Sequence, residues 1–423
     1  MPNRRISPKI SEDYQISLTA PEVLTLDNGI PVYEISMGTQ DVLKLELVFF
    51  AGRPYEHKKL VGRATTAMLK EGTQHTSAAD LAEKVDFYGG TISTPVNLDS
   101  INIVLYCLTK HFGALLPLFA EMIYQPAFLE SELRSYVKNN QQRVIVDLTK
   151  NDVVAYRKIT EFIYGKDHPY GYNSFPETYG ALERSDLEQH HKDYFTSDNC
   201  KIFLSGRSNK ETVPLLNQYF GQEKSKKKTS PTYFAPTIGI PQQVNLSLPN
   251  SLQTAIRIGR GLFDKKHPDF NGFYMLNMIL GGFFGSRLMT NIREEKGYTY
   301  NIFSMIDTMC RDGYFYIGTE VGNQVVAPTI KEIYTEIEEL QRTEVSAEEL
   351  KMTRNYVLGN TLTMLDGAFN TMDLVKTLIL EDIPLQQFEE LIHTVKHINA
   401  KTIRNLAQKY LNREDLWEVI VGP

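Results

Sequence analysis

The sequence predicts an α+β protein made of two homologous domains, each a largely antiparallel sheet packed against helices. The chain has 423 residues, too long for one ordinary domain and enough for two domains of about 200 residues. Short alternating strands lie among longer amphipathic helices, with no regular strand-helix-strand order. This mixture favours sheets covered by helices on one side over a doubly wound parallel sheet.

One pattern occurs twice along the chain. In each half an apolar strand leads into a Gly-Arg pair, a polar turn and a helix, with the pairs at Gly52-Arg53 and Gly259-Arg260. The strands are expected at residues 45–50 and 254–258, and the helices from about Val61 and Phe270. Because the two Gly-Arg pairs are about one domain length apart, the repetition indicates an internal duplication.

The clearest break in composition marks the boundary between the two halves. Residues 222–236 contain four lysines among small polar residues and include two prolines. Such a segment is typical of a solvated linker. The predicted domains are therefore residues 1–221 and residues 237–423, joined by the linker 222–236.

Composition and charge exclude several classes of protein. Hydrophobic residues make up 42% and charged residues 23% of the chain, as in soluble globular proteins. The formal charge of −6 and the isoelectric point near 5.9 give no support for a nucleic-acid partner. No apolar stretch approaches the ~20 residues of a membrane span, so no membrane partner is expected. Three widely spaced cysteines and the absence of a signal-peptide pattern favour a reducing, cytoplasmic location.

Residues 60–73 predict a short amphipathic helix. Arg63, Thr66 and Ala67 are expected to share a second face of this helix. The apolar face consists of Val61, Ala64, Met68 and Leu69.

The order of a strand, Gly-Arg, a polar turn, this helix, Gly72-Thr73 and a later Gly-Gly pair resembles the pitrilysin/insulinase family of zinc peptidases. Active members carry an inverted His-x-x-Glu-His motif on this helix, where the histidines bind zinc and the glutamate activates water. Counting back from Gly72-Thr73, the resemblance assigns these positions to Arg63, Thr66 and Ala67. Arginine offers no lone pair, threonine is no base near neutral pH, and alanine has no donor atom. The resemblance therefore implies a degenerate zinc motif.

The remaining candidates do not supply a metal site either. The family's third ligand is a glutamate on a later helix, but residues 139–145 contain no carboxylate and Asp147 follows them alone. His393 and His397 are four residues apart without a glutamate between them, and Asn399, a predicted helix N-cap, places both before a helix. We therefore predict no metal in this chain.

Residues 281–300 carry a more specific likeness. Ser286 is expected to cap a short helix, Gly297 to end it in a left-handed conformation, and a strand to begin at Tyr298. The block resembles the family's second-domain signature of Gly-Ser-Arg-Leu, Arg-Glu-x-x-Gly and a tyrosine three places after the glycine. In active members the arginine and tyrosine contact the substrate carbonyl, and the matching residues here are Arg293 and Tyr300. The alternative is that Arg293 pairs with a nearby acid and Tyr300 packs in the sheet.

The resemblance implies three functional hypotheses. In the first, the chain is the non-catalytic subunit of a heterodimeric zinc peptidase acting on unfolded peptides. It would supply Arg293 and Tyr300 in trans to a homologous partner, which carries His-x-x-Glu-His and the zinc. In the second, it is a structural or binding protein that keeps the peptidase fold without a proteolytic role. The third, an active stand-alone peptidase, requires zinc bound to this chain.

Overall fold

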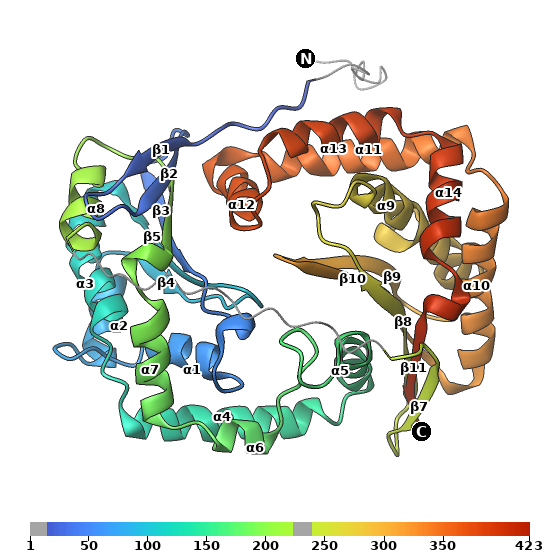
Figure 1. Ribbon diagram of the computed structural model, residues 1–423, viewed down its shortest axis with the longest axis horizontal. Helices are drawn as coiled ribbons and strands as arrows, with labels where there is room; N and C mark the ends of the chain where they lie inside the picture. Colours follow the sequence, from blue (N-terminus) through green and yellow to red (C-terminus); the bar gives the residue numbers. More distant parts are fainter. Residues whose placement is uncertain (1–14, 223–238) are drawn as a thin grey trace, which may run out of the picture.

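The computed structural model describes residues 15–222 and 239–423, which form two sheet-plus-helix halves that face each other (Figure 1). The predicted linker, apart from its first residue, and its lysine run lie outside the described residues. The domain boundaries remain a prediction. In the part of the chain described, no helix combines the length and apolar composition needed to cross a membrane.

The first half contains a six-stranded sheet with the order β1-β2-β6-β3-β5-β4. Its strands are β1 (Glu22–Thr25), β2 (Pro31–Ser36), β3 (Val42–Phe49), β4 (Thr91–Ser93), β5 (Ile101–Leu108) and β6 (Cys200–Gly206). Its helices are α1 (Val61–Met68), α2 (Ala78–Phe87), α3 (Phe112–Tyr124), α4 (Glu130–Asp147), α5 (Asn151–Tyr164), α6 (Pro176–Gly180), α7 (Arg184–Tyr194) and α8 (Thr212–Phe220).

The second half contains a five-stranded sheet with the order β7-β11-β8-β10-β9. Its strands are β7 (Gln243–Ser247), β8 (Gln253–Leu262), β9 (Ile302–Met309), β10 (Asp312–Gly322) and β11 (Trp417–Gly422). Its helices are α9 (Phe270–Asn277), α10 (Val326–Arg342), α11 (Ala347–Met364), α12 (Gly367–Leu380), α13 (Gln386–His397) and α14 (Ala400–Tyr410).

The two sheets share one topology, which agrees with the predicted duplication. In each, the strand that precedes the first long helix, β3 or β8, is antiparallel to both of its neighbours. In each, the last strand of the half, β6 or β11, pairs in parallel with an early strand, β2 or β7. One detail differs from the sequence prediction: strand β8 continues through Gly259-Arg260 instead of ending before them. The predicted helix starts at Val61 and Phe270 are confirmed.

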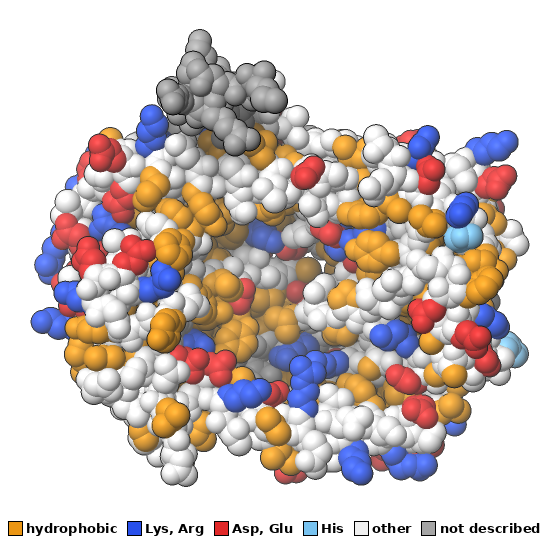
Figure 2. Space-filling view, turned by 180° about the vertical axis from the view of Figure 1, so that it is seen from behind, with side chains coloured by type: hydrophobic (Ala, Val, Ile, Leu, Met, Phe, Trp, Pro, Cys, Tyr) orange, Lys and Arg blue, Asp and Glu red, His pale blue; other side chains and the backbone are white. Residues whose placement is uncertain are grey.

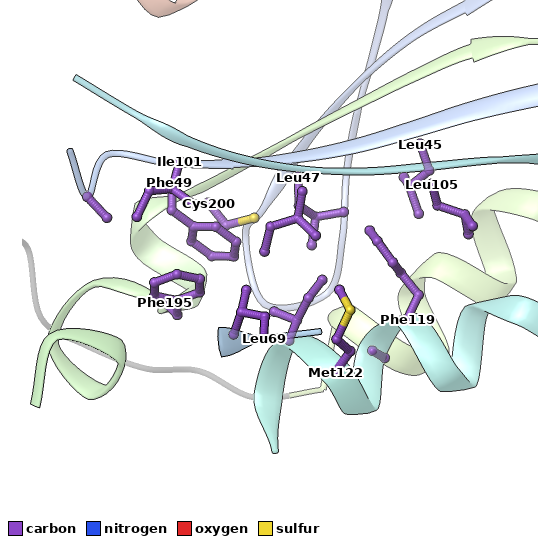
Figure 3. Packing of buried hydrophobic residues seen from close by; sticks show 14 of the residues in the cluster. Leu45, Leu47, Phe49, Leu69, Ile101, Leu105, Phe119, Met122, Phe195 and Cys200 are labelled. Atoms are coloured by element: carbon purple, nitrogen blue, oxygen red, sulfur yellow. The ribbon is translucent and has the colours of Figure 1, made fainter. Parts of the chain in front are cut away.

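The core of the first half forms between the sheet and its own helices. Leu45, Leu47 and Phe49 alternate along β3 and point toward Phe119 and Met122 of α3 (Figure 3). All five side chains are fully buried. The period-two apolar pattern of this strand therefore faces a helical layer, as the fold class predicts.

One helix of each half also packs against the sheet of the other half. Helix α5 packs Ala155 and Ile159 against β8 and β11, and α12 packs Met372 and Val375 against β2 and β6 (Figure 1). The turn between β9 and β10 adds a third contact, since the backbone N–H of Cys310 donates to a carboxylate of the first half at 3.0 Å. Helices of both halves therefore pack on each sheet, and these contacts hold the halves together.

A buried ionic network lies where α12 meets the first sheet. Lys44 of β3 bonds Asp373 at 2.6 Å, and Lys376 of α12 bonds Glu46 at 2.8 and 2.9 Å. Asn102 donates a further hydrogen bond to Glu46 at 2.6 Å. Burial by itself lowers the pKa of Lys44, but its carboxylate partners outweigh burial and raise that pKa. Every charge in the network is paired, as burial requires.

Candidate functional site

Helix α1 is held close to the first sheet. A Cβ atom on Gly62 would lie 2.6 Å from the carbonyl oxygen of Ala51, so only glycine permits this approach. The Glu56 carboxylate accepts hydrogen bonds from the backbone N–H groups of Leu60 and Gly62 at 3.2 and 3.1 Å. These bonds satisfy donors that the first turn of a helix leaves free. Glu56 therefore supports α1 and is not a free carboxylate.

A second set of contacts fixes Glu56 and the arginine beside it. Burial raises the pKa of Glu56, although the Tyr172 hydroxyl donates a hydrogen bond to it at 2.6 Å. The Arg53 guanidinium lies 4.2 Å from the centre of the Tyr172 ring and donates to the carbonyl oxygens of Pro169 and Tyr172 at 3.1 Å. The Gly52-Arg53 pair of the sequence pattern thus positions a cation beside α1.

The three zinc-motif positions do not all face the same space. Arg63 is exposed, Ala67 is half-buried, and both line a cavity of about 730 Å³ between α1 and α4, here called the α1–α4 cavity. Thr66 is fully buried, and its hydroxyl donates to the Gly62 carbonyl at 2.7 Å. The prediction of one shared face is therefore wrong for Thr66. Consecutive helical residues are about 100° apart, which turns Thr66 from Ala67 toward the core.

Helix α4 forms the opposite wall of the α1–α4 cavity with Asn140 and Arg143. This is the segment in which the family's third zinc ligand would be expected, and it presents an amide and a guanidinium. Asp147 does not line the cavity. Its carboxylate accepts a hydrogen bond from Lys150 at 2.8 Å, which lowers its pKa, and lies 3.9 Å from Nε of Arg143.

The residues of the α1–α4 cavity do not fit a zinc ion. Arg63 and Arg143 are cations that repel a metal, Ala67 has no donor atom, and the Glu56 oxygens accept hydrogen bonds from α1 and Tyr172. Within residues 15–222 and 239–423, no three His, Cys, Asp or Glu side chains lie together as a metal site. His393 and His397, predicted to precede a helix, instead stack their rings within α13, with centroids 4.2 Å apart.

The structure brings Arg293 and Tyr300 together in the second half. Nε of Arg293 donates to the backbone carbonyl of Tyr300 at 3.0 Å, and the guanidinium lies 4.5 Å from the centre of the Phe284 ring. Both residues line a cavity of about 510 Å³, here called the Arg293 cavity. The Tyr300 side chain is 92% exposed, so the alternative that it packs in the sheet is wrong. Arg293 also approaches the neighbouring Glu294, at 3.7 Å.

The conformation around Tyr300 differs from the sequence prediction in two ways. The N–H of Tyr298 donates to the carbonyl of Ile292 at 3.0 Å, so the chain folds back on the preceding helical turn and strand β9 begins only at Ile302. The Ser286 hydroxyl is buried without a hydrogen-bond partner among the described residues, so it does not cap the helix. Gly297 has φ +65°, which confirms the left-handed helix end.

Other residues of the 281–300 block have supporting roles. Arg287 forms a bidentate ion pair with Glu349 of α11, at 2.7 and 2.9 Å. Asn291 donates to Glu332 and Glu336 of α10 at 3.1 and 2.7 Å. The block is thereby fixed on two helices, while Arg293 and Tyr300 face the Arg293 cavity. The two cavities share no lining residue, so the described chain does not join Arg293 and Tyr300 to Arg63 and Ala67 in one site.

Comparison with known proteins decides the family. Residues 33–166 match the family described as insulinase (peptidase family M16), and residues 181–357 match the description peptidase M16 inactive domain. The chain belongs to peptidase family M16. The first M16 match contains α1 and most of the α1–α4 cavity, and the second contains Arg293 and Tyr300.

Individual M16 relatives are similar over most of their length. A Bacillus subtilis protein named uncharacterized zinc protease YmxG is 22% identical over 84% of this chain and 86% of its own. A Helicobacter pylori protein named non-peptidase homolog YmxG is 19% identical over 89% of this chain and 88% of its own length.

Two solved structures have the same fold. The peptidase M16 inactive domain from Pseudomonas fluorescens has a TM-score of 0.85 at 21% identity, over 95% of this chain and 98% of that one. The periplasmic protease PqqL from Escherichia coli has a TM-score of 0.79 at 15% identity, over all of this chain but 48% of PqqL.

Proposed function

We propose that this chain is the non-catalytic subunit of a paired zinc peptidase. It would supply Arg293 and Tyr300 to the active site of a homologous partner that carries His-x-x-Glu-His and binds the zinc. The observation that carries the proposal is the Arg293 cavity, where the guanidinium is held beside a tyrosine that is 92% exposed. The α1–α4 cavity offers no ligands for a metal of its own.

The two side chains suit acyl-transfer chemistry. When water attacks a peptide carbonyl, negative charge develops on the carbonyl oxygen, and a guanidinium and a phenol placed there stabilise the transition state more than the substrate. The ion pair of Arg287 with Glu349 and the hydrogen bonds of Asn291 to α10 fix the backbone of the block that carries Arg293 and Tyr300. Because such donors act best when they are pre-positioned, this rigidity favours a role in catalysis over the alternative that they are surface residues without a function.

Two further observations support pairing and a peptide substrate. The chain covers 48% of PqqL, so that single chain is about as long as two copies of this one. The molecule is hollowed at its centre, where the two halves face each other (Figure 2). A partner that closes over this hollow would enclose a chamber for an extended, unfolded peptide.

The test uses this chain together with its zinc-bearing partner and a quenched fluorescent peptide. We expect the pair to cleave the peptide, and Arg293→Ala or Tyr300→Phe to lower kcat by roughly 10²–10³. Arg342→Ala is the matched control, because Arg342 is an exposed arginine of α10 outside both cavities. Unchanged activity in the Arg293 and Tyr300 variants would contradict the proposal.

A second candidate is a structural or binding protein without a proteolytic role. The Helicobacter pylori relative named non-peptidase homolog favours it. This candidate predicts a stable complex with a partner but no peptide cleavage, and no effect of Arg293→Ala on that complex. The same purified pair distinguishes the two candidates.

We also propose that the chain works in the cytoplasm. The three cysteines are free, and two of them, Cys107 and Cys200, are buried in the first core. Free thiols suit a reducing compartment. Fractionation of cells that express the tagged chain tests this location.

A further inference from the structure

The α1–α4 cavity carries more positive than negative charge. Arg53, Arg63 and Arg143 line it, and its one lining carboxylate is Glu56. Both oxygens of Glu56 already accept hydrogen bonds, from the backbone of α1 and from the Tyr172 hydroxyl. Figure 2 shows Lys and Arg side chains gathered on the lower side of the central hollow, the side on which α4 lies in Figure 1.

The arginines of this cavity have donors to spare. Arg63 is exposed and has no ion-pair partner in the described parts of the chain. Arg143 has one carboxylate neighbour, Asp147, which lies 3.9 Å from Nε. Guanidinium groups form paired hydrogen bonds with carboxylates and other oxyanions, so two such groups on facing helices are suited to bind an anion in the cavity.

Neutral polar groups extend this site. Asn140 donates its amide to the carbonyl of Tyr136 at 2.8 Å, which leaves the amide oxygen of Asn140 available as an acceptor. The Tyr136 hydroxyl is buried without a hydrogen-bond partner among the described residues, and Asn97 lines the same cavity from the loop after β4. A volume of about 730 Å³ suits a ligand of several residues and far exceeds a single small anion.

We propose that the α1–α4 cavity binds a peptide through one of its carboxylate groups, either the C-terminal carboxylate or that of an acidic side chain. Arg63 and Arg143 would grip the carboxylate from α1 and α4, while Asn140 and Asn97 contact the adjoining backbone. The cavity would thus hold part of a peptide through cations fixed to the protein. This binding does not require the zinc-bearing partner.

The test measures binding to the chain alone by isothermal titration calorimetry, so its result is independent of any peptidase assay. Four acetylated tetra-alanine peptides serve as probes. One has a free C-terminus, one is C-terminally amidated, and two more amides replace one alanine by Glu or by Gln. We expect the free acid or the Glu peptide to bind at least about tenfold more tightly than the plain amide and the Gln peptide.

Variants locate the binding. Arg63→Gln and Arg143→Gln should each weaken the carboxylate peptide by about tenfold, since each removes one charge-assisted contact. Arg134→Gln is the matched control, because Arg134 also lies on α4 but lines a different surface hollow. Circular dichroism of each variant checks that the fold is unchanged.

Three outcomes of the peptide titrations would overturn the proposal: equal binding of acid and amide peptides, equal weakening by Arg134→Gln and Arg63→Gln, or no binding by any peptide. Titration with inorganic phosphate tests whether the cavity binds any small oxyanion and not specifically a peptide carboxylate. If phosphate binds as tightly as the carboxylate peptides and displaces them, the cavity is a small-anion site and the peptide assignment is wrong. Weaker binding of phosphate, with peptide contacts that it cannot replace, supports the proposal.

Discussion

The α1–α4 cavity and the Arg293 cavity belong to halves with the same sheet topology, but their chemistry differs. In the first half Gly62 lets α1 approach the sheet and Glu56 accepts hydrogen bonds at the N-terminus of α1, while the zinc-motif positions hold no metal ligand. In the second half Arg287 and Asn291 fix the block on two helices, and Arg293 and Tyr300 project into the cavity with polar groups that can contact a ligand.

This difference teaches that the scaffold and the chemistry of a site are carried by different residues. Side chains that face a cavity can change without cost to the fold, since they make few contacts, whereas residues that face the core cannot. Arg63, which is exposed, illustrates the first case, and its neighbour Ala64, which is fully buried in the core, illustrates the second. Substitutions that separate scaffold from chemistry therefore test the comparison.

The largest effect on stability is expected where the two halves meet. Lys376→Ala leaves Glu46, which is 1% exposed, with Lys44 as its remaining cation, at 3.5 Å. Loss of a partner from a buried ion pair should lower the free energy of unfolding by about 3 kcal/mol, measured by urea denaturation. Lys266→Ala removes an exposed pair with Asp382 and should cost less than about 1 kcal/mol. Equal effects would show that the halves are not held by this network.

The next effect concerns the support of α1. Gly62→Ala places a Cβ atom 2.6 Å from the Ala51 carbonyl and should cost about 1–3 kcal/mol of unfolding free energy through overpacking. Gly359→Ala is the control, with an effect of opposite sign expected, because nothing lies within 4 Å of the Cβ position of Gly359 in α11. Alanine should stabilise that helix by up to about 1 kcal/mol. Thermal unfolding of both variants distinguishes a required glycine from an incidental one.

Acid should weaken the first half through His190, which packs behind α1. Burial lowers the pKa of His190 to about 4, below its unfolded value of 6.5, and its Nε2 pairs with the Ala51 carbonyl at 3.0 Å. Because the folded pKa is depressed, this stabilisation is present above about pH 6.5 and is lost as the pH falls toward 4. Between pH 7 and pH 5 the loss should be about 2 kcal/mol.

Urea denaturation of His190→Gln at both pH values tests this linkage. The glutamine amide can still donate to Ala51 but does not titrate, so the variant should lose less stability between pH 7 and pH 5 than the parent chain. An identical pH dependence in both proteins would assign the acid sensitivity to other groups.

The smallest expected effect is on metal binding. Arg63→His with Ala67→His places two imidazoles on the α1–α4 cavity, but α4 still offers Asn140 and Arg143 where a third ligand is needed. We expect no zinc to remain with the variant after gel filtration with a chelator, as measured by atomic absorption. One tightly held zinc per chain would show that the residues at those two positions alone prevent metal binding in the first half.

Much of the fold and part of each site could be predicted from the sequence. The sequence predicted the starts of α1 and α9, and Asn399 caps α14 as expected by accepting from the N–H of Thr402 at 2.8 Å. The identities of Arg63 and Ala67 excluded a zinc ligand whatever their surroundings, because neither side chain offers a lone pair to a metal. The pairing of Arg293 with Tyr300 followed from their place in the family signature.

The contribution of Arg53, Glu56 and Arg143 to the α1–α4 cavity could not be predicted in the same way. Arg53 and Glu56 lie in the segment between β3 and α1, Arg143 lies on α4, and no local pattern shows that they converge. The Gly52-Arg53 pair was one available signal, since it recurs in both halves. Its neighbour Glu56 resembles an ordinary surface acid until the N–H groups of α1 are placed beside it.

By itself, the sequence determined the periodic elements, the repeated topology and the absence of ligand atoms at the zinc-motif positions, because these depend on residue type and on neighbours a few positions away. Only the tertiary structure decided which polar residues are buried. Lys44 and Glu46 alternate along β3 like residues of a solvent face, yet α12 covers them and supplies Asp373, 329 positions from Lys44. The burial of a strand face depends on which distant segment of the chain packs against it. The alternation of residues along one strand does not identify that segment.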